Sequence, residues 1–249
     1  MQYGICNLSI IPLRFEPADP SELVSQVLYG EHFKVLEQRK QWSKIRLAFD
    51  KYEGWIDNKQ FLEVDELTYN NLQTKTPILS SDLVEFVFDE QQQLYPISLG
   101  STLNPLDILK HNFEGKTISG IKPKSEIITA AFNYLNAPYL WGGKTPFGID
   151  CSGFTQMVYK LNGYKILRDA SQQATQGEAL SFIEESEPGD LAFFDNAEGN
   201  ITHVGIIMKD NYIIHAHGKV RIDRLDHSGI YNAEKRTHTH KLRVIKKII

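Results

Sequence analysis

The chain has 249 residues, of which 41% are hydrophobic and 23% are charged, and its formal net charge is −4. This length and composition suit a soluble globular protein with one large domain or two smaller ones. The slight negative charge provides no broad basic surface, which argues against nucleic acid and anionic membranes as partners.

The amino-terminal residues and the cysteines favour a reducing compartment. Residues 1–13 lack a basic run followed by a long apolar stretch, and about 18 uninterrupted apolar residues occur nowhere in the sequence. The sequence contains only Cys6 and Cys151, whereas secreted folds stapled by disulfides usually carry more cysteines. We therefore expect a cytoplasmic protein without a membrane span, unless an export signal has been cleaved from it.

Residues 1–65 have the pattern of a small all-β barrel. Short β-type runs, separated by proline, glycine and charged turns, occur at residues 26–28, 32–37, 42–49 and 54–56. Residues 44–47 alternate charged and apolar side chains, as a strand with one solvent-exposed face does. Residues 66–120 contain further β-like pieces at 83–88 and 95–99. We interpret this second segment as either a degenerate second barrel or a linker.

Residues 121–249 change from helical to strand periodicity. One helix is indicated by Ile127, Ile128, Ala131, Phe132 and Leu135, and a second by Phe154, Met157, Val158 and Leu161. After Gly189, strand patterns occur at residues 191–194, 203–208, 212–217, 220–222 and 242–249. Helices followed by a strand meander predict an α+β domain.

Cys151 is predicted to begin the second helix, where a thiol can be reactive. A thiol attacks as the thiolate, and the unpaired N–H groups and dipole of a helix N-terminus stabilise that anion. Asp150 is a suitable helix cap, but its charge would raise the thiol pKa, so a nearby cation such as a protonated histidine must outweigh it. The alternative is a buried and inert cysteine.

Two histidines are predicted to share one face of a hairpin. If residues 209–211 form its turn, Gly205 lies opposite His215 and His203 lies opposite His217. His203 and His215 are then diagonal neighbours, so one can act as a general base while the other orients it. A slip of one residue would move His215 to the opposite face.

Metal binding is the alternative use of these side chains. Cys151, His203 and His215 could hold a zinc ion instead. His238 and His240 also share a face, but no cysteine or carboxylate lies close to them in sequence to complete a site. The catalytic interpretation needs neither a metal nor an organic cofactor, and we expect neither.

Several motifs resemble known families. WSKIR at residues 42–46 and YEGWI at residues 52–56 resemble a bacterial SH3-like domain. Five motifs resemble, in the same order, the NlpC/p60 family of papain-like cysteine peptidases: PYLWGG at 138–143, GIDCSGF at 148–154, GDLAFF at 189–194, HVGI at 203–206 and YIIHA at 212–216. The resemblance implies a papain-like catalytic domain over residues 121–249.

The same resemblance assigns roles to four residues. It implies that Cys151 is the nucleophile, His203 the base and His215 the orienting third member. Tyr139 occupies the place of the family's upstream tyrosine, whose hydroxyl would bind the oxyanion together with the backbone N–H of Cys151. Packing of Tyr139 against Trp141 is the alternative.

The combination of both domains resembles the γ-D-glutamyl-L-diamino acid endopeptidases that recycle cell-wall peptides. Those enzymes cut after D-glutamate in L-alanyl-γ-D-glutamyl-L-diamino acid peptides, require a free amino terminus, and use the SH3-like domain to close part of the cleft. The resemblance implies a small muropeptide as the partner. Whether the diamino acid is diaminopimelate or lysine stays open.

Five residues are candidates for substrate binding: Asp150, Ser152, Tyr52, Arg168 and Trp141. Asp150 could pair with the substrate ammonium, and the Tyr52 hydroxyl could complete the hydrogen bonds of that ammonium. Arg168 could bind a substrate carboxylate or could be a solvated surface charge. Glu16 or Glu22 could add a second acid, and the sequence does not choose between them.

Two other functions are compatible with the same motifs. One is a wall-binding module whose second domain is catalytically inactive, and the other is an amidase or acyltransferase built on the same thiol. Binding to insoluble sacculus without product release would favour the module, whereas cleavage of small soluble peptides would favour the peptidase.

Overall fold

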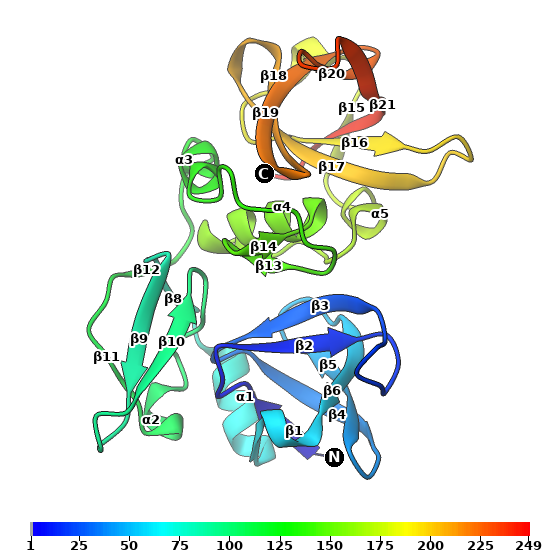
Figure 1. The fold of residues 1–249 in the computed structure, drawn as a ribbon. Helices are drawn as coiled ribbons and strands as arrows, with labels where there is room; N and C mark the ends of the chain where they lie inside the picture. The colour runs from blue at the N-terminus through cyan, green and yellow to red at the C-terminus, as the bar shows by residue number, and fades with distance from the viewer. Residues whose placement is uncertain (1) are drawn as a thin grey trace. The chain divides into compact units, whose positions relative to one another are not determined.

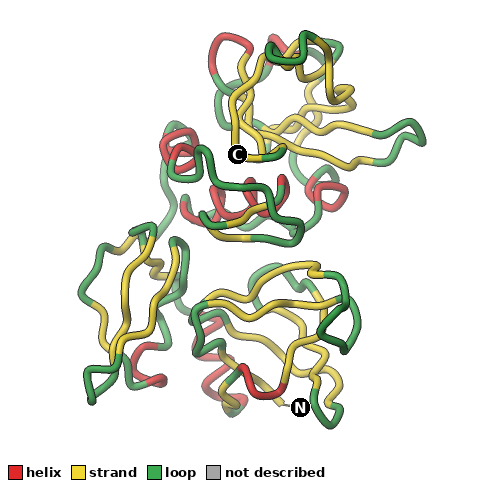
Figure 2. Tube along the Cα trace, viewed as in Figure 1, coloured by secondary structure: helices red, strands yellow, loops and turns green. Residues whose placement is uncertain are grey.

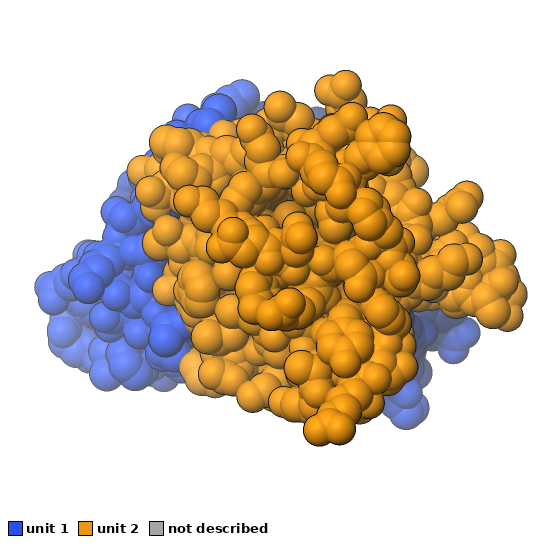
Figure 3. Space-filling view, turned by 90° about the horizontal axis from the view of Figure 1, so that it is seen from above, with its two compact units in different colours: residues 1–121, 141–146 blue, residues 122–140, 147–249 orange. Residues whose placement is uncertain are grey.

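The computed structural model describes residues 2–249, which form two compact units (Figures 1 and 3). Unit 1 contains the chain up to residue 121 together with residues 141–146, and unit 2 contains residues 122–140 and 147–249. Each unit has its own sheet and its own buried core. Within the described chain, no helix is both long enough and apolar enough to cross a lipid bilayer.

Unit 1 begins with a seven-stranded antiparallel sheet, which confirms the β-structure predicted for residues 1–65 (Figure 2). Its strands are β1 (Gln2–Ile5), β2 (Ile10–Arg14), β3 (Leu23–Leu28), β4 (His32–Gln38), β5 (Trp42–Leu47), β6 (Glu53–Asp57) and, after the short 3-10 helix η1 (Asn58–Gln60), β7 (Leu62–Val64). They pair in the order β3-β2-β6-β5-β4-β1-β7. Alternate side chains of β2, β4 and β5 are buried and form the core, together with Cys6.

The remainder of unit 1 contains a helix that the sequence analysis did not predict. Helix α1 (Glu66–Thr74) begins after Asp65, whose side chain accepts a hydrogen bond from the Thr68 N–H. Only Tyr69 and Leu72 of this helix are buried, so its apolar pattern is too sparse to stand out. The other elements are β8 (Ile78–Ser80), β9 (Val84–Phe88), β10 (Leu94–Ser98), α2 (Leu106–Leu109), β11 (Asn112–Phe113), β12 (Thr117–Ser119) and β13 (Lys144–Thr145). Strands β9 and β10, which were predicted, pair antiparallel.

Unit 2 is built around a closed six-stranded antiparallel barrel. Its strands are β16 (Leu191–Asp195), β17 (Ile201–Ile207), β18 (Tyr212–His217), β19 (Lys219–Asp226), β20 (Gly229–Asn232) and β21 (Thr237–Lys247), with β15 (Glu178–Leu180) attached at the edge of β21. The barrel closes because β21 pairs with both β16 and β20. Its apolar core includes Ala192, Phe194, Ile213 and Ile230.

Helices precede the barrel in unit 2, which confirms the predicted α+β class. They are α3 (Glu126–Phe132), α4 (Cys151–Leu161) and α5 (Ala170–Gln173), with the short strand β14 (Gly148–Ile149) before α4 and the 3-10 helices η2 (Ile183–Glu185) and η3 (Lys209–Asn211) in the loops. Every residue of α4 is buried, and the helix packs against β17 and β18. This packing brings the start of α4 to the strand that carries His203.

Candidate active site

Cys151 is the first residue of α4, as predicted. The preceding Asp150 has an extended backbone, and its Oδ1 accepts a hydrogen bond of 2.6 Å from the backbone N–H of Gly153. This contact satisfies one of the N–H groups that a helix leaves unpaired at its N-terminus, so Asp150 fixes where the helix begins. The thiol is thereby held at the positive end of the helix dipole.

The sulfur of Cys151 lies against the backbone of β17. Its Sγ is 4.0 Å from the carbonyl oxygen of Thr202, and the side chain is only 6% exposed. Burial, with a further contribution from the charge of Asp150, raises the pKa of the thiol to about 12, against the opposing effects of the Val204 N–H and Arg168. The thiol therefore keeps its proton at neutral pH until a base removes it.

The hairpin of β17 and β18 has the predicted register. Gly205 pairs with His215, and the backbone N–H of Met208 donates to the carbonyl of Tyr212 across the turn. A Cβ atom on Gly205 would lie 2.7 Å from Ile213 Cδ1 and 2.9 Å from the Cβ of His215, so only glycine leaves His215 in place. The register thus directs His203 and His215 to one face.

The two imidazoles are joined by a hydrogen bond. His203 Nε2 lies 2.8 Å from His215 Nδ1, and both side chains are buried. Burial holds the pKa of His203 well below the usual histidine value, and the neighbouring His215 lowers it further by a smaller amount. Burial also lowers the pKa of His215, which a hydrogen bond to Asp223 opposes only in part. Both rings are therefore neutral at physiological pH.

Asp223 and Arg221 complete this polar chain, and the sequence analysis missed both. His215 Nε2 lies 3.0 Å from Asp223 Oδ2, which also accepts a hydrogen bond of 2.7 Å from Arg221 Nε. In the β18–β19 ladder His215 pairs with Arg221 and Ile213 pairs with Asp223, so Asp223 is diagonal to His215 on one face. Extending the predicted hairpin by one strand would have revealed it.

Two further histidines surround the pair. The ring of His240 stacks on His203 with centroids 4.2 Å apart and an interplanar angle of 25°, and His217 meets His240 edge to face at 4.8 Å. Burial is the main cause that lowers the pKa of His240 to about 3. Among the described residues, no group of three or more histidine, cysteine or carboxylate side chains is arranged to hold a metal ion. His203 and His215 bind each other instead.

Tyr139 lies beside the segment that leads to the nucleophile. It forms a parallel bridge with Ile149, and its backbone N–H donates to the carbonyl of Gly218 at 3.0 Å. Burial raises the pKa of its hydroxyl, and the charges of Cys151 and Asp150 add to the increase. Tyr139 therefore keeps a protonated hydroxyl, which is the form that can donate to an oxyanion. Its role in doing so stays a prediction.

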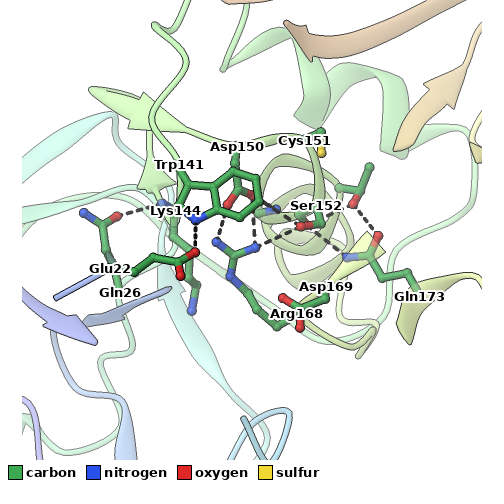
Figure 4. A network of polar contacts seen from close by, with 12 residues as sticks. Glu22, Gln26, Trp141, Lys144, Asp150, Cys151, Ser152, Arg168, Asp169 and Gln173 are labelled. Atoms are coloured by element: carbon green, nitrogen blue, oxygen red, sulfur yellow. Dashed lines mark hydrogen bonds and ion pairs between the residues drawn. The ribbon is translucent and has the colours of Figure 1, made fainter. Parts of the chain in front are cut away.

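Arg168 is buried and makes an ion pair with Asp150 (Figure 4). Its Nη1 donates to Asp150 Oδ1 and to Ser152 Oγ, each at 3.0 Å, and its Nη2 donates to Asp150 Oδ2 at 2.7 Å. The side chain is 1% exposed, so the alternative of a solvated surface charge is wrong. The predicted roles of Asp150, Ser152 and Arg168 in substrate binding stay predictions.

The remaining candidates belong to unit 1. Tyr52 is half-buried and packs against the core of the seven-stranded sheet. Trp141 is 58% exposed, and its Nε1 donates to Glu22 Oε1 at 2.6 Å (Figure 4). Glu16 is exposed, and of the two acids only Glu22 has this indole contact. Roles for Tyr52 and Trp141 in substrate binding stay predictions.

Residues 141–146 are held to β3 within unit 1. The backbone N–H of Lys144 donates to Gln26 Oε1 at 2.7 Å (Figure 4). At Gly142 the backbone has a φ of 76°, and a Cβ there would lie 2.3 Å from the carbonyl oxygen of Leu23. Glycine is required at this position both by conformation and by the close approach of β3. The motif-based boundary at residue 121 predicts these residues in the second domain, whereas the structure groups them with unit 1.

Two family profiles match the chain. The profile described as the NlpC/P60 family matches residues 136–240, and that described as the bacterial dipeptidyl-peptidase Sh3 domain matches residues 13–61. The NlpC/P60 range contains Cys151, the hydrogen-bonded pair His203 and His215, and Asp223. The Sh3 range contains strands β3 to β6.

Several known proteins are similar over most of their length. Gamma-D-glutamyl-L-lysine dipeptidyl-peptidase of Bacillus subtilis (strain 168) is 30% identical over 77% of this chain and 71% of its own. Dipeptidyl-peptidase 6 of Lysinibacillus sphaericus is 26% identical over 85% of this chain and 87% of its own. The crystal structure of an NlpC/P60 family protein from Bacillus cereus ATCC 10987 matches with a TM-score of 0.77 over 99% of both chains at 19% identity, which shows a shared fold.

Proposed function

Because the chain belongs to the NlpC/P60 family of cysteine peptidases, we propose that it hydrolyses the γ-D-glutamyl-L-diamino acid bond of small cell-wall peptides. The observation that carries the proposal is the site in unit 2, where a thiol at a helix start lies against the strand that bears a neutral, oriented imidazole. The names of the relatives from Bacillus subtilis and Bacillus cereus support the choice of bond.

The proposed reaction is acyl transfer through a thioester. As Cys151 Sγ attacks the γ-glutamyl carbonyl carbon, its proton passes to His203. The carbonyl oxygen becomes an oxyanion that accepts hydrogen bonds from the Tyr139 hydroxyl and the backbone N–H of Cys151. His203 then gives its proton to the departing amine, and later takes a proton from the water that hydrolyses the thioester.

The electrostatics of the site support a general-base mechanism. The raised pKa of Cys151 and the lowered pKa of His203 favour a neutral thiol beside a neutral imidazole before substrate binds. Proton transfer is then coupled to attack on the carbonyl, a form of catalysis that contributes roughly 10²- to 10⁴-fold to the rate. No step of this reaction uses a metal ion or an organic cofactor.

The proposal extends to the substrate's amino terminus. Asp150 would pair with a free ammonium group, and Ser152, Arg168, Tyr52 and Trp141 would contribute to substrate binding. These contacts would restrict the enzyme to small muropeptides that begin with an unblocked L-alanine. We further propose a role in the recycling of released wall peptides in the cytoplasm, which the two unpaired cysteines support.

Defined peptides test this function. Purified protein is incubated with L-Ala-γ-D-Glu-diaminopimelate and with its lysine analogue, and the products are identified by mass spectrometry. We expect L-Ala-D-Glu and the free diamino acid, no cleavage of the N-acetylated peptides, and no cleavage by Cys151→Ala. Cys6→Ala is the matched control, because Cys6 lies in the core of unit 1. Turnover by Cys151→Ala would remove the thiol from the mechanism, and equal cleavage of acetylated peptides would remove the ammonium contact.

A further inference from the structure

We propose that Asp223 is a positioning residue that fixes the tautomers of both histidines, through His215, and so leaves Nδ1 of His203 unprotonated and able to act as the base. The inference rests on the proposed roles of Cys151 and His203. It concerns how the base is prepared, and it is independent of which peptide bond is cut.

Asp223 is held as an acceptor. It is 6% exposed, and Arg221 binds it through two hydrogen bonds, Nε to Oδ2 at 2.7 Å and Nη2 to Oδ1 at 3.0 Å. Burial alone would raise the pKa of this carboxyl, yet the hydrogen bonds from His215 and Arg221 hold it below its usual value. The group is therefore ionised at neutral pH and has no proton to donate.

The tautomers follow from this one acceptor. Because Asp223 cannot donate, the proton in its contact with His215 must reside on His215 Nε2. A neutral imidazole carries only one N–H, so His215 Nδ1 is an acceptor. The partner of that acceptor is His203 Nε2 at 2.8 Å, which must then be the donor. His203 Nδ1 is left without a proton, and this is the state that a general base requires.

The thiol lies against the strand that carries this base. Its sulfur is 4.0 Å from the carbonyl oxygen of Thr202, and a hydrogen bond from the N–H of Val204 lowers the pKa of the thiol, so the sulfur meets the backbone on both sides of His203 in sequence. If His203 carried its proton on Nδ1 instead, that nitrogen could not accept the thiol proton in the proposed reaction. The correct tautomer is thus a condition for activity, as in other triads.

The other groups around His215 and Asp223 do not compete for this role. His217 and His240 approach His215 through ring contacts with centroids 6.3 and 5.7 Å away, and the structure gives neither a hydrogen bond to His215. Lys235 contributes only to the electrostatics of His217 and His240, and Glu234 pairs with the outer side of Arg221 at 3.4 Å. Among the described contacts, Asp223 is the partner that receives the Nε2 proton of His215.

The decisive variant is Asp223→Leu. Leucine has a similar volume but no acceptor, so nothing holds the proton on His215 Nε2 and the tautomers of both histidines are no longer fixed. An amide is less informative, because its carbonyl oxygen could still accept from His215 Nε2 and Arg221 Nε at the position of Oδ2. We expect kcat to fall roughly 10²- to 10⁴-fold with little change in KM, as in catalytic triads that lose the correct tautomer. Asp226→Leu is the matched control: Asp226 lies on the same strand and also contacts a histidine, His238, but both side chains are about half exposed.

Two readouts separate this inference from the proposed function. Nitrogen-15 NMR of the imidazoles in the unaltered protein at pH 7.5 should show protonated Nε2 and bare Nδ1 on His203 and on His215. The rate of Cys151 alkylation by iodoacetamide should fall in Asp223→Leu and not in Asp226→Leu. Neither measurement needs a substrate, so both remain decisive if no wall peptide is cleaved. A proton on His203 Nδ1 in the unaltered protein, or unchanged tautomers and alkylation in Asp223→Leu, would overturn the inference.

Discussion

Replacement of Arg168 by methionine should destabilise unit 2 far more than the loss of a surface charge. Among the described contacts, the guanidinium donates two hydrogen bonds to the Asp150 carboxylate and one to Ser152 Oγ, and the side chain is almost completely buried. Methionine fills much of the same volume but provides no donor. The carboxylate of Asp150 would then stay buried and capped to Gly153 but would lose its ion pair with Arg168.

The size of the effect follows from the loss of that buried ion pair. Removing one partner of a buried ion pair costs about 3–5 kcal/mol, a large share of the roughly 5–15 kcal/mol by which a domain is stable. For a unit of this size we expect the melting temperature to fall by roughly 10–15 °C. The double variant Asp150→Asn/Arg168→Met should be less destabilised than the sum of the single variants, by about 1–3 kcal/mol, because the two side chains are in direct contact.

Urea unfolding followed by circular dichroism measures these values, with Arg46→Met as the matched control. Arg46 also pairs with a carboxylate, Glu53 at 2.7 Å, but the two side chains are 45% and 33% exposed and Lys44 also contacts Glu53 at 3.3 Å, so this change should cost less than about 1 kcal/mol. A loss below about 1 kcal/mol for Arg168→Met, or strict additivity in the double variant, would refute the description of a buried pair at the start of α4.

Three further changes test other parts of the site. Gly205→Ala should displace His215, because the added Cβ would lie 2.9 Å from that residue's own Cβ; we expect kcat/KM to fall at least roughly tenfold, with a stability loss of about 1–3 kcal/mol. In His203→Ala, iodoacetamide should alkylate Cys151 slowly at pH 7, with a rate that rises steeply above pH 9, because burial raises the pKa of the thiol; rapid alkylation at pH 7 would contradict this. Acidification below about pH 6.5 should lower the free energy of unfolding by up to about 1.4 kcal/mol per pH unit for each buried imidazole that stays neutral, because the unfolded chain then binds more protons than the folded one. Urea titrations at pH 7.5 and 5.5 measure this difference. Equal stabilities at the two pH values would contradict the lowered pKa values of His203 and His215.

The parts of the site that depend on local rules could be predicted from the sequence. Asp150 marks the start of α4 because a short acidic side chain caps the unpaired N–H groups of a helix. The pairing of Gly205 with His215 follows from a three-residue turn and the period of two in a strand. Both rules act over a few residues, and both outcomes agree with the structure.

The parts that depend on tertiary pairing could not be predicted in the same way. Arg168 is 18 positions from Asp150 in the sequence. Its direct neighbour in sequence is Asp169, and an arginine next to an aspartate is typical of a surface loop. The attachment of Trp141 to Glu22 joins residues 119 positions apart. No periodicity encodes such contacts, because they are decided by which surfaces meet after the strands and helices have formed.

The Arg168–Asp150 and Arg221–Asp223 ion pairs of unit 2 have a similar electrostatic effect. Asp150 precedes the thiol and Asp223 contacts His215, and each carboxylate is bound by an arginine through at least two hydrogen bonds. Without Arg168, the charge of Asp150 would raise the thiol pKa further and oppose formation of the thiolate. Each arginine therefore offsets the charge of a buried carboxylate that contacts its neighbours, Asp150 as the cap of α4 and Asp223 as the acceptor that we propose sets the tautomers, and in the proposed reaction Arg168 thereby favours the thiolate form of Cys151.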